Sequence, residues 1–490
     1  MNETCVFNRI TFALPIETYR VDAFITSDER LPVVTEYVLR LLRICEKISL
    51  CGLRDYFGFT DAEALAVVES LERQGLVQVT DDYLGLSGFA IERFEQSSED
   101  YPRFTKVEER RDNVTFDLVS FSPLQYKNHT MLTDNWIRLN ASEESIGNSL
   151  ELAKRAYFKR FPEIVRMNED LKKKAIDLYS VEDIQTKKRG YLAIPVNFSL
   201  NEQGQVERKA DSAFENGASR ELVDAFHESV SNFIPVSQKA DLSHLDIFMD
   251  FFDLTWMSAY ITGKLFNFRK FAADVQTGAI SMPKGTSPLF GNIYLTENAQ
   301  SIAQKIKSRR KEAKYNKLHS SIAWLVPDDP LWGRGDALQT AIGRISLELK
   351  DGNHDELHLF AAAETGAEQA VTNHFRGPEI KNLHLYRPTD SVDYSMGGRL
   401  ELLIYPPGFV VAMFHLSIPG DSTLRAPVGI ISSRAKDVKN ARQVILELAA
   451  EQRYLGKANF GKQVARTSEQ PSLLAECGFI CYSDLLIKPS

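Results

Sequence analysis

Apolar runs separated by turns follow one another most densely between residues 398 and 434. Three apolar runs in this stretch, at 400–405, 410–418 and 428–432, are separated by turns rich in Pro and Gly. Apolar runs of this length bounded by turn residues predict buried strands. Further runs alternate with amphipathic segments between residues 319 and 490. Strands that alternate with helices predict a layered α/β domain for this C-terminal region.

The first 94 residues show a different pattern. Two apolar runs, at 7–14 and 19–25, flank Pro15 and predict a pair of short strands within residues 1–30. Residues 31–94 predict a compact module of helices and strands. Its elements are a helix at 34–45, a strand at 48–50, helices at 53–57 and 60–75, and strands at 76–80 and 83–86. Thr60 and Glu63 form a capping box that begins the last helix, and Gly75 ends it.

Residues 105–318 predict a central region of mixed helices and strands. The charged stretch at 103–111 predicts a connecting arm. Helices are expected at 140–174, 220–233 and 242–265, and a hairpin at 191–209. We therefore expect an α+β multidomain protein with an N-terminal module, a central mixed region and a C-terminal α/β domain.

Composition limits the classes of function. Lys and Arg number 58 against 66 Asp and Glu, which gives a formal net charge of −8. Such a chain does not coat nucleic acid through bulk charge, although a local basic patch can still bind it. Five cysteines in 490 residues favour free thiols in a reducing compartment. The sequence contains no run of 18 apolar residues, so it predicts no membrane span. We expect a cytoplasmic protein without a membrane partner and without a cofactor.

Two groups of side chains with metal-ligand chemistry are explained without a metal. Asp246, Asp250 and Asp253 recur at helical spacing and are interpreted as the solvated edge of a helix. His354 and His358 precede and enter an expected strand, where residues four apart lie about 13 Å from each other, too far for one ion.

The module at residues 31–94 resembles the winged helix-turn-helix superfamily in its order of elements and turns. That resemblance implies a last helix that enters the DNA major groove. Four carboxylates in this helix outnumber its single basic residue, Arg73. They are Asp61, Glu63, Glu69 and Glu72. Because phosphates repel carboxylates, we expect the module to dock a protein partner, and a transcriptional regulator that reads DNA through residues 60–75 is the alternative.

The strongest basic cluster lies within residues 299–318. Its members are Lys305, Lys307, Arg309, Arg310, Lys311, Lys314 and Lys317. A solvated helix with a cationic C-terminal end accounts for this cluster. The functional alternative is a surface that contacts nucleic-acid phosphates.

One constellation between residues 398 and 434 resembles the second half of a phospholipase D superfamily domain, in which H-x-K-x4-D precedes a Gly-Ser pair. His415 matches the histidine and Gly429 follows 14 residues later, but Ser417 and Ser422 stand at the lysine and aspartate positions. The resemblance implies a phosphodiesterase or nuclease with His415 as nucleophile and Ser417 and Ser432 nearby. The missing lysine leaves the phosphate without its cation, so a fold that has lost catalysis is expected. A hydrogen-bonded strand histidine in an unrelated α/β fold is the other interpretation.

Together these patterns favour a non-catalytic or accessory component of a nucleic-acid-linked system, of the kind found in bacterial anti-phage defence. In this hypothesis the module at 31–94 docks a protein and the basic cluster contacts nucleic acid. The alternatives are a phosphodiesterase that uses His415 and a DNA-binding regulator.

Overall fold

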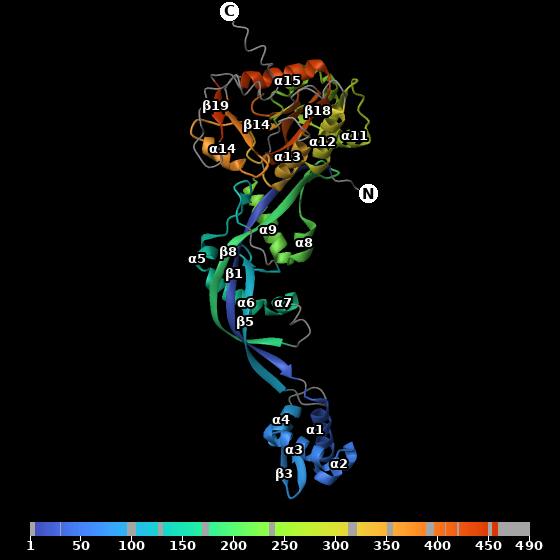
Figure 1. Cartoon of the computed structure of the whole chain (residues 1–490), viewed down its shortest axis with the longest axis vertical. Helices are drawn as coiled ribbons and strands as arrows, with labels where there is room; N and C mark the ends of the chain where they lie inside the picture. Colours follow the sequence, from blue (N-terminus) through green and yellow to red (C-terminus); the bar gives the residue numbers. More distant parts are fainter. Residues whose placement is uncertain are drawn as a thin grey trace, which may run out of the picture.

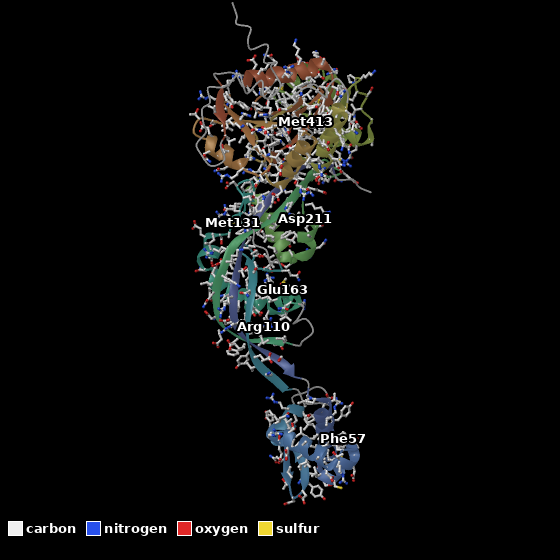
Figure 2. The ribbon with its side chains drawn as sticks, viewed as in Figure 1. Phe57, Arg110, Met131, Glu163, Asp211 and Met413 are labelled. Atoms are coloured by element: carbon white, nitrogen blue, oxygen red, sulfur yellow. The ribbon has the colours of Figure 1, made fainter. Side chains whose placement is uncertain are left out.

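The computed structural model describes most of the chain between residues 5 and 458. The described segments are 5–29, 31–95, 104–125, 131–168, 176–234, 241–311, 321–349, 356–388, 396–406, 408–418, 421–448 and 453–458. They form an elongated α+β protein in three parts, a body at one end, a winged-helix module at the other and a curved arm between them (Figure 1). Met413 lies in the body, Arg110 in the arm and Phe57 in the module (Figure 2). The predicted α+β multidomain class is confirmed.

The arm is organised around β1 (Cys5–Glu29), a single strand of 25 residues. It pairs antiparallel with β8 (Ile176–Leu200) along nearly its whole length and with β5 (Phe104–Asp117) along its second half. Short strands extend the sheet. They are β6 (Pro123–Leu124), β7 (Ile137–Arg138) and β9 (Val206–Ala210). At about 3.3 Å per residue, β1 is about 80 Å long.

The prediction of two short strands on either side of Pro15 is wrong, because Pro15 lies inside β1. The carbonyl oxygen of Pro15 accepts a hydrogen bond from the Leu118 N–H at 3.0 Å, one residue past the end of β5 at Asp117. The missing N–H of Pro15 is therefore on the side that faces Leu118, so the pairing of β1 with β5 ends at this residue, and the ladder that runs on from Ile16 and Asp117 is not interrupted. Pro195 in β8 occupies the equivalent position one residue past the end of its β9 pairing.

Residues 103–111 were predicted to be a charged linker or connecting arm, and residues 104–111 are not a linker but the first half of β5, a strand of the arm. The described side chains of this half are exposed or half-buried on both faces of the sheet. A strand that buries neither face has no apolar alternation, so the pattern did not identify it. Charged residues along this edge, such as Lys106, Glu109 and Arg111, oppose pairing with another chain.

The winged-helix module is inserted between β1 and β5, whose ends pair Glu29 with Phe104. Its elements are α1 (Val33–Cys45), β2 (Lys47–Ser49), α2 (Leu50–Phe57), α3 (Asp61–Arg73), β3 (Val77–Thr80), β4 (Tyr83–Leu86) and α4 (Gly88–Glu95). The three strands pair in the order β2-β4-β3, which is the winged-helix arrangement. The predicted capping box is confirmed, since Thr60 accepts from the Glu63 N–H and Glu63 accepts from the Thr60 N–H. The module has its own apolar core and stands at the tip of a strand hairpin.

Two long helices predicted for the central region are each broken in the structure. The predicted helix at 140–174 is divided, in its described part, into α5 (Glu143–Gly147), α6 (Ser149–Lys159) and α7 (Phe161–Met167), and residues 169–174 lie outside the described residues. α6 and α7 cover one face of the arm. The predicted helix at 242–265 is divided into α10 (Leu245–Phe251) and a short 3-10 helix, η1 (Thr255–Tyr260). Asp253 lies between them with a left-handed φ of 53°. Asp253 therefore does not continue the helix face that carries Asp246 and Asp250. Two further helices pack beside the arm, α8 (Ser212–Gly217) and α9 (Arg220–Phe233).

The body is built on an eight-stranded sheet in the order β12-β18-β17-β16-β13-β14-β15-β19. Its strands are β12 (Thr286–Phe290), β13 (Ile322–Leu325), β14 (Leu357–Ala362), β15 (Asn382–Tyr386), β16 (Leu400–Tyr405), β17 (Phe409–Ile418), β18 (Asp421–Ser432) and β19 (Tyr454–Lys457). β13, β14 and β15 are parallel, and the other pairs are antiparallel. The predicted strands at 400–405 and 410–418 are confirmed. β12 lies before residue 319, so the sheet begins earlier in the chain than the predicted C-terminal domain.

Helices cover both faces of this sheet. α12 (Thr296–Arg310) and α13 (Asp336–Leu349) pack on one face, and α15 (Ala435–Leu448) packs on the other. α14 (Glu368–His374) follows β14. No helix in the described segments is long and apolar enough to cross a membrane.

The arm and the body share one apolar core. Phe12 of β1 contacts Phe226 of α9, with ring centroids 6.3 Å apart, and Phe248 of α10 contacts Phe414 of β17 at 5.3 Å. All four side chains belong to the same buried cluster. The arm is therefore anchored by packing inside the body.

Candidate functional site

α3 presents one face to solvent at the end of the molecule opposite the body. Its buried residues are Ala64, Val68 and Leu71. Ala62, Leu65 and Ala66 lie on the outer side, and Leu65 is 50% exposed. Residues three and four positions apart share a helix face, so these three side chains form one small apolar strip. We call Ala62, Leu65 and Ala66 the α3 strip.

Carboxylates surround the α3 strip. Asp61, Glu69 and Glu72 are exposed on the same helix. Residues 31–95 contain 11 Asp and Glu against 6 Lys and Arg, a net charge of −5. Arg54 on α2 does not supply a phosphate contact here, because its guanidinium lies 2.8 Å from the Asp61 carboxylate. The outer surface of α3 is therefore apolar at its centre and negative around it.

Exposed apolar side chains are concentrated on the winged-helix module. Ten of the 20 large apolar side chains that are exposed in the described part of the chain belong to it. They are Val33, Val34, Tyr37, Ile44, Tyr56, Leu65, Val79, Tyr83, Phe89 and Ile91. The module therefore carries a larger share of these side chains than its share of the chain length.

The basic cluster of the body forms the C-terminal half of α12 and the residue that follows it. Its described members are Lys305, Lys307, Arg309, Arg310 and Lys311, and the other two predicted members, Lys314 and Lys317, lie outside the described residues. Lys305 Nζ lies 5.6 Å from the centre of the Phe409 ring, and burial lowers the pKa of Lys305. Lys307 Nζ lies 3.9 Å from Glu348 Oε1. Lys307 and Lys311 are exposed, so the cluster faces solvent in part.

His415 is buried on the face of the body sheet that packs against α12 and α13. Its Nε2 lies 2.7 Å from Glu401 Oε2 on the neighbouring strand β16, and the two side chains are 1% and 0% exposed. Glu401 Oε1 accepts a second hydrogen bond from Trp324 Nε1 at 3.0 Å. A buried carboxylate requires such partners, and here a histidine and a tryptophan provide them. In this position the imidazole is not presented to a substrate.

The other two residues of the predicted catalytic group, Ser417 and Ser432, lie on opposite faces of the sheet. Ser417 shares the face of β17 that carries His415, because strand residues two apart point the same way. Ser432 lies on the opposite face of the sheet, about 17 Å from His415 along the strand register. Its Oγ donates to the Asp437 carboxylate, and it accepts from the Arg434 backbone N–H at 3.2 Å, so it stabilises the start of α15. The catalytic role of His415, Ser417 and Ser432 stays a prediction.

Two other strand histidines form a buried pair. His358 Nδ1 lies 3.0 Å from His384 Nε2, and His384 Nδ1 lies 3.0 Å from the Tyr454 hydroxyl. Burial lowers the pKa of His358 to about 4 and holds the pKa of His384 well below its usual range. The sequence pattern linked His358 to His354, which lies outside the described residues. The partner of His358 in the structure is His384. The sequence signal that could have indicated this pair is one histidine in each of two consecutive strands, β14 and β15.

Comparisons with known proteins do not assign a family. No protein-family model matches the chain, and no curated protein matches it significantly. Among solved structures, that of TrmBL2, an archaeal chromatin protein whose structure shows a novel mode of DNA binding, aligns with 87% of this chain and 95% of that chain. The aligned residues are 10% identical, and the TM-score is 0.18. A similarity at that level supports no conclusion about fold or function.

Proposed function

We propose that this protein is a non-catalytic adaptor that docks a protein partner through its winged-helix module. The observation that carries the proposal is the α3 strip, an exposed apolar strip with carboxylates around it. A DNA-reading helix needs Arg, Lys, Asn or Gln at that surface to meet phosphates and base edges. Apolar side chains framed by like charges suit a protein surface instead.

The chemistry of the α3 strip defines the partner. Its contact surface should be apolar at the centre, to cover Leu65, and rich in Lys and Arg around it, to face Glu69 and Glu72. Complementary charge of this kind speeds association and disfavours partners of the wrong sign. The arm then holds the partner at the far end of a sheet whose central strand is about 80 Å long.

The second part of the proposal concerns the basic cluster of the body, Lys305, Lys307, Arg309, Arg310 and Lys311, which we call the α12 cluster. In the proposal this cluster contacts nucleic acid. Lys307 and Lys311 support it because they are exposed at the end of a helix whose other cations lie beside them. A local cluster binds phosphates in spite of an acidic chain. The protein would then connect a bound protein to a nucleic acid without acting on either.

Cross-linking in cells tests the docking surface. A photoreactive phenylalanine analogue is placed at Leu65 in the full chain, and the same analogue is placed at Leu347, which is 64% exposed on α13 of the body, as a control. We expect a discrete protein adduct from position 65 only, with the cross-linked peptide of the partner containing Lys or Arg. The adduct should disappear when Glu69 and Glu72 are changed to Lys. An adduct at position 65 that is destroyed by nuclease would refute the docking proposal.

The phosphodiesterase alternative makes a separate prediction. It requires His415 to leave Glu401 and reach solvent. Hydrolysis of a generic phosphodiester is measured with the wild-type protein and with His415→Ala. We expect both to remain at background, and a wild-type rate that depends on His415 would establish the enzyme.

A further inference from the structure

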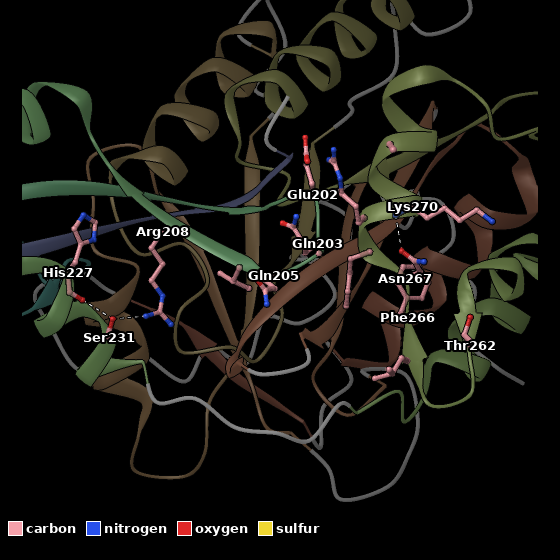
Figure 3. A pocket seen from close by; sticks show the side chains of 16 residues that line it. Glu202, Gln203, Gln205, Arg208, His227, Ser231, Thr262, Phe266, Asn267 and Lys270 are labelled. Carbon is pink, nitrogen blue, oxygen red and sulfur yellow. Dashed lines mark hydrogen bonds between the residues drawn. The ribbon is translucent and has the colours of Figure 1, made fainter. Parts of the chain in front are cut away.

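Hollows of different size adjoin the region where the arm enters the body. A wide groove lies beside β9 and α11 (Phe268–Thr277), and Glu202, Arg208 and His227 are among the side chains on its walls (Figure 3). Its volume of about 1300 Å³ exceeds the roughly 300–1,000 Å³ of most small-molecule pockets, so its walls do not define the size of a ligand. A second cavity measures about 190 Å³, which leaves room for a small ion.

This second cavity, which we call the junction cavity, is enclosed by the arm and the body together. β1 contributes Arg9 and Thr11, which point to the same face of the strand because they are two residues apart. α12 contributes its first turn, which begins at Thr296, and α13 contributes the side that runs from Asp336 to Arg344. An ion held in the junction cavity therefore lies between the root of the arm and two helices of the body.

Two arginines give the junction cavity positive charge. Arg344 Nη1 donates to the backbone carbonyl oxygen of Thr296 at 3.3 Å, and both arginines are half-buried. Among the residues that the structure describes, neither guanidinium has an ion-pair partner, and that of Arg9 has no hydrogen-bond partner either. The planar fork of a guanidinium matches the oxygens of an anion such as phosphate. Two such forks on one small cavity favour an anion as its ligand.

A buried hydroxyl adds a hydrogen-bond donor to the wall. Thr11 is 3% exposed, and its backbone N–H donates to the Arg334 carbonyl oxygen at 3.0 Å, but its hydroxyl has no hydrogen-bond partner within the described segments. The Tyr294 hydroxyl of the same lining is already used, because it donates to Asn8 Oδ1 at 2.7 Å and accepts from the Gly333 N–H at 3.2 Å. Buried polar groups usually have a partner, so the Thr11 hydroxyl points to a ligand oxygen in the cavity.

Asp336 restricts which anion can bind. It is the one carboxylate among the described residues of the lining, and its Oδ1 accepts from Trp136 Nε1 at 3.3 Å. A carboxylate repels an anion that has lost all its protons, but it accepts a hydrogen bond from one that keeps a proton. Inorganic phosphate keeps a proton at neutral pH and sulfate keeps none, whereas a phosphomonoester loses its last proton at a pKa of about 6. Asp336 therefore favours inorganic phosphate.

We propose that the junction cavity binds one inorganic phosphate ion. Arg9 and Arg344 face its negative charge, Thr11 donates to one of its oxygens, and Asp336 accepts its proton. Because β1 belongs to the arm and α13 to the body, the bound ion ties the two parts together at the root of the arm. The proposal depends neither on protein docking by the α3 strip nor on the α12 cluster.

Isothermal titration calorimetry of the full chain tests the choice of ion. Sodium phosphate, sodium sulfate and glycerol 3-phosphate are titrated near neutral pH at constant ionic strength. We expect inorganic phosphate to bind at least roughly tenfold more tightly than the other two, because it alone donates a proton to Asp336 at this pH.

Variants of the wall test the roles of its side chains. Arg9→Gln with Arg344→Gln should weaken phosphate binding more than roughly tenfold, and Thr11→Val, which keeps the shape of the side chain, should weaken it roughly fivefold. Asp336→Asn keeps the acceptor for Trp136 and should narrow the preference for phosphate over sulfate, because an amide can donate to an unprotonated oxygen. A change that only disturbed the fold would weaken the binding of both ions equally.

A charge-matched control separates position from net charge. It carries Arg155→Gln and Arg220→Gln, two exposed residues outside the junction cavity, and should bind phosphate like the wild type. If circular dichroism shows that the variant without Arg9 and Arg344 is misfolded, Thr11→Val and the ion preference of Asp336→Asn still decide the question.

The proposal would be overturned by a wild-type protein that binds no phosphate, or by a folded arginine variant that binds it as tightly as the wild type. Equal loss in the arginine variant and the charge-matched control would also contradict it. Sulfate that binds as tightly as phosphate would remove the role of Asp336 and with it the choice of phosphate. Tighter binding of glycerol 3-phosphate would assign the cavity to a phosphomonoester instead.

Discussion

Reversing the charge of the α3 surface tests the hypothesis that its carboxylates keep the winged-helix module from binding DNA. In the variant Glu69→Lys with Glu72→Lys, the net charge of residues 31–95 changes from −5 to about −1. Both positions are exposed, and Glu and Lys have similar helix propensities. Cations near the C-terminal end of a helix are also favourable, so the module should remain folded.

The expected size of the effect follows from counterion release. Each new lysine–phosphate contact adds about 0.9 to the slope of log K against log salt, so two contacts add about 1.8. Relative to 1 M salt, that slope corresponds to roughly 60-fold tighter binding at 0.1 M salt, or about 2.4 kcal/mol. Contributions from surfaces outside the module, such as the α12 cluster, are the same in both proteins and cancel in the comparison.

The assay is fluorescence anisotropy of a labelled duplex with the full chain over a range of salt concentrations. The variant Glu69→Gln with Glu72→Gln separates the loss of repulsion from the gain of attraction, and it should lie between the other two proteins. Wild-type binding that is abolished by Arg73→Ala with Gln74→Ala would refute the reasoning. It would show that α3 already contacts the duplex in spite of its carboxylates.

Three further predictions concern stability. Gly429→Ala should destabilise the body by about 3 kcal/mol or more in thermal unfolding, because its Cβ would lie 2.0 Å from the Ala412 carbonyl oxygen, whereas Gly217→Ala, with no atom within 4 Å, should not. Thr60→Ala should cost the module about 1 kcal/mol in urea unfolding, and Thr60→Ser should restore it, because the hydroxyl caps α3. Acidification from about pH 6.5 to pH 4 should destabilise the body by about 3 kcal/mol through His358, because its lowered pKa lets the unfolded chain bind the proton first. His358→Gln should flatten the pH dependence of the denaturant midpoint, and an unchanged slope would contradict this assignment.

Elements that bury at least one face were predictable from the sequence. The helix that begins at Thr60 and the strands at 400–405 and 410–418 follow from local signals, a capping box and apolar runs between turn residues. Elements that lack such signals were missed. The first half of β5 is solvated on both faces, and the break at Asp253 depends on a single left-handed residue.

The candidate sites were predictable only in part. The acidic character of α3 could be counted from the sequence, since neighbouring residues on a helix share its surface. A hydrogen-bonded histidine in a buried strand was one of the two interpretations of His415, but its partner Glu401 could not be identified, because it lies on another strand.

The sequence by itself determined the winged-helix module, the charge of its outer helix and the layered character of the C-terminal region, because periodicity and caps act over one or two turns or a single strand. Only the tertiary structure decided that Glu29 pairs with Phe104 and places the module at the tip of a long arm. It also decided that the arm shares a core with the body and that His415 pairs with Glu401. These features depend on strand register and side-chain packing between residues far apart in the chain, and such pairings are selected by the whole fold.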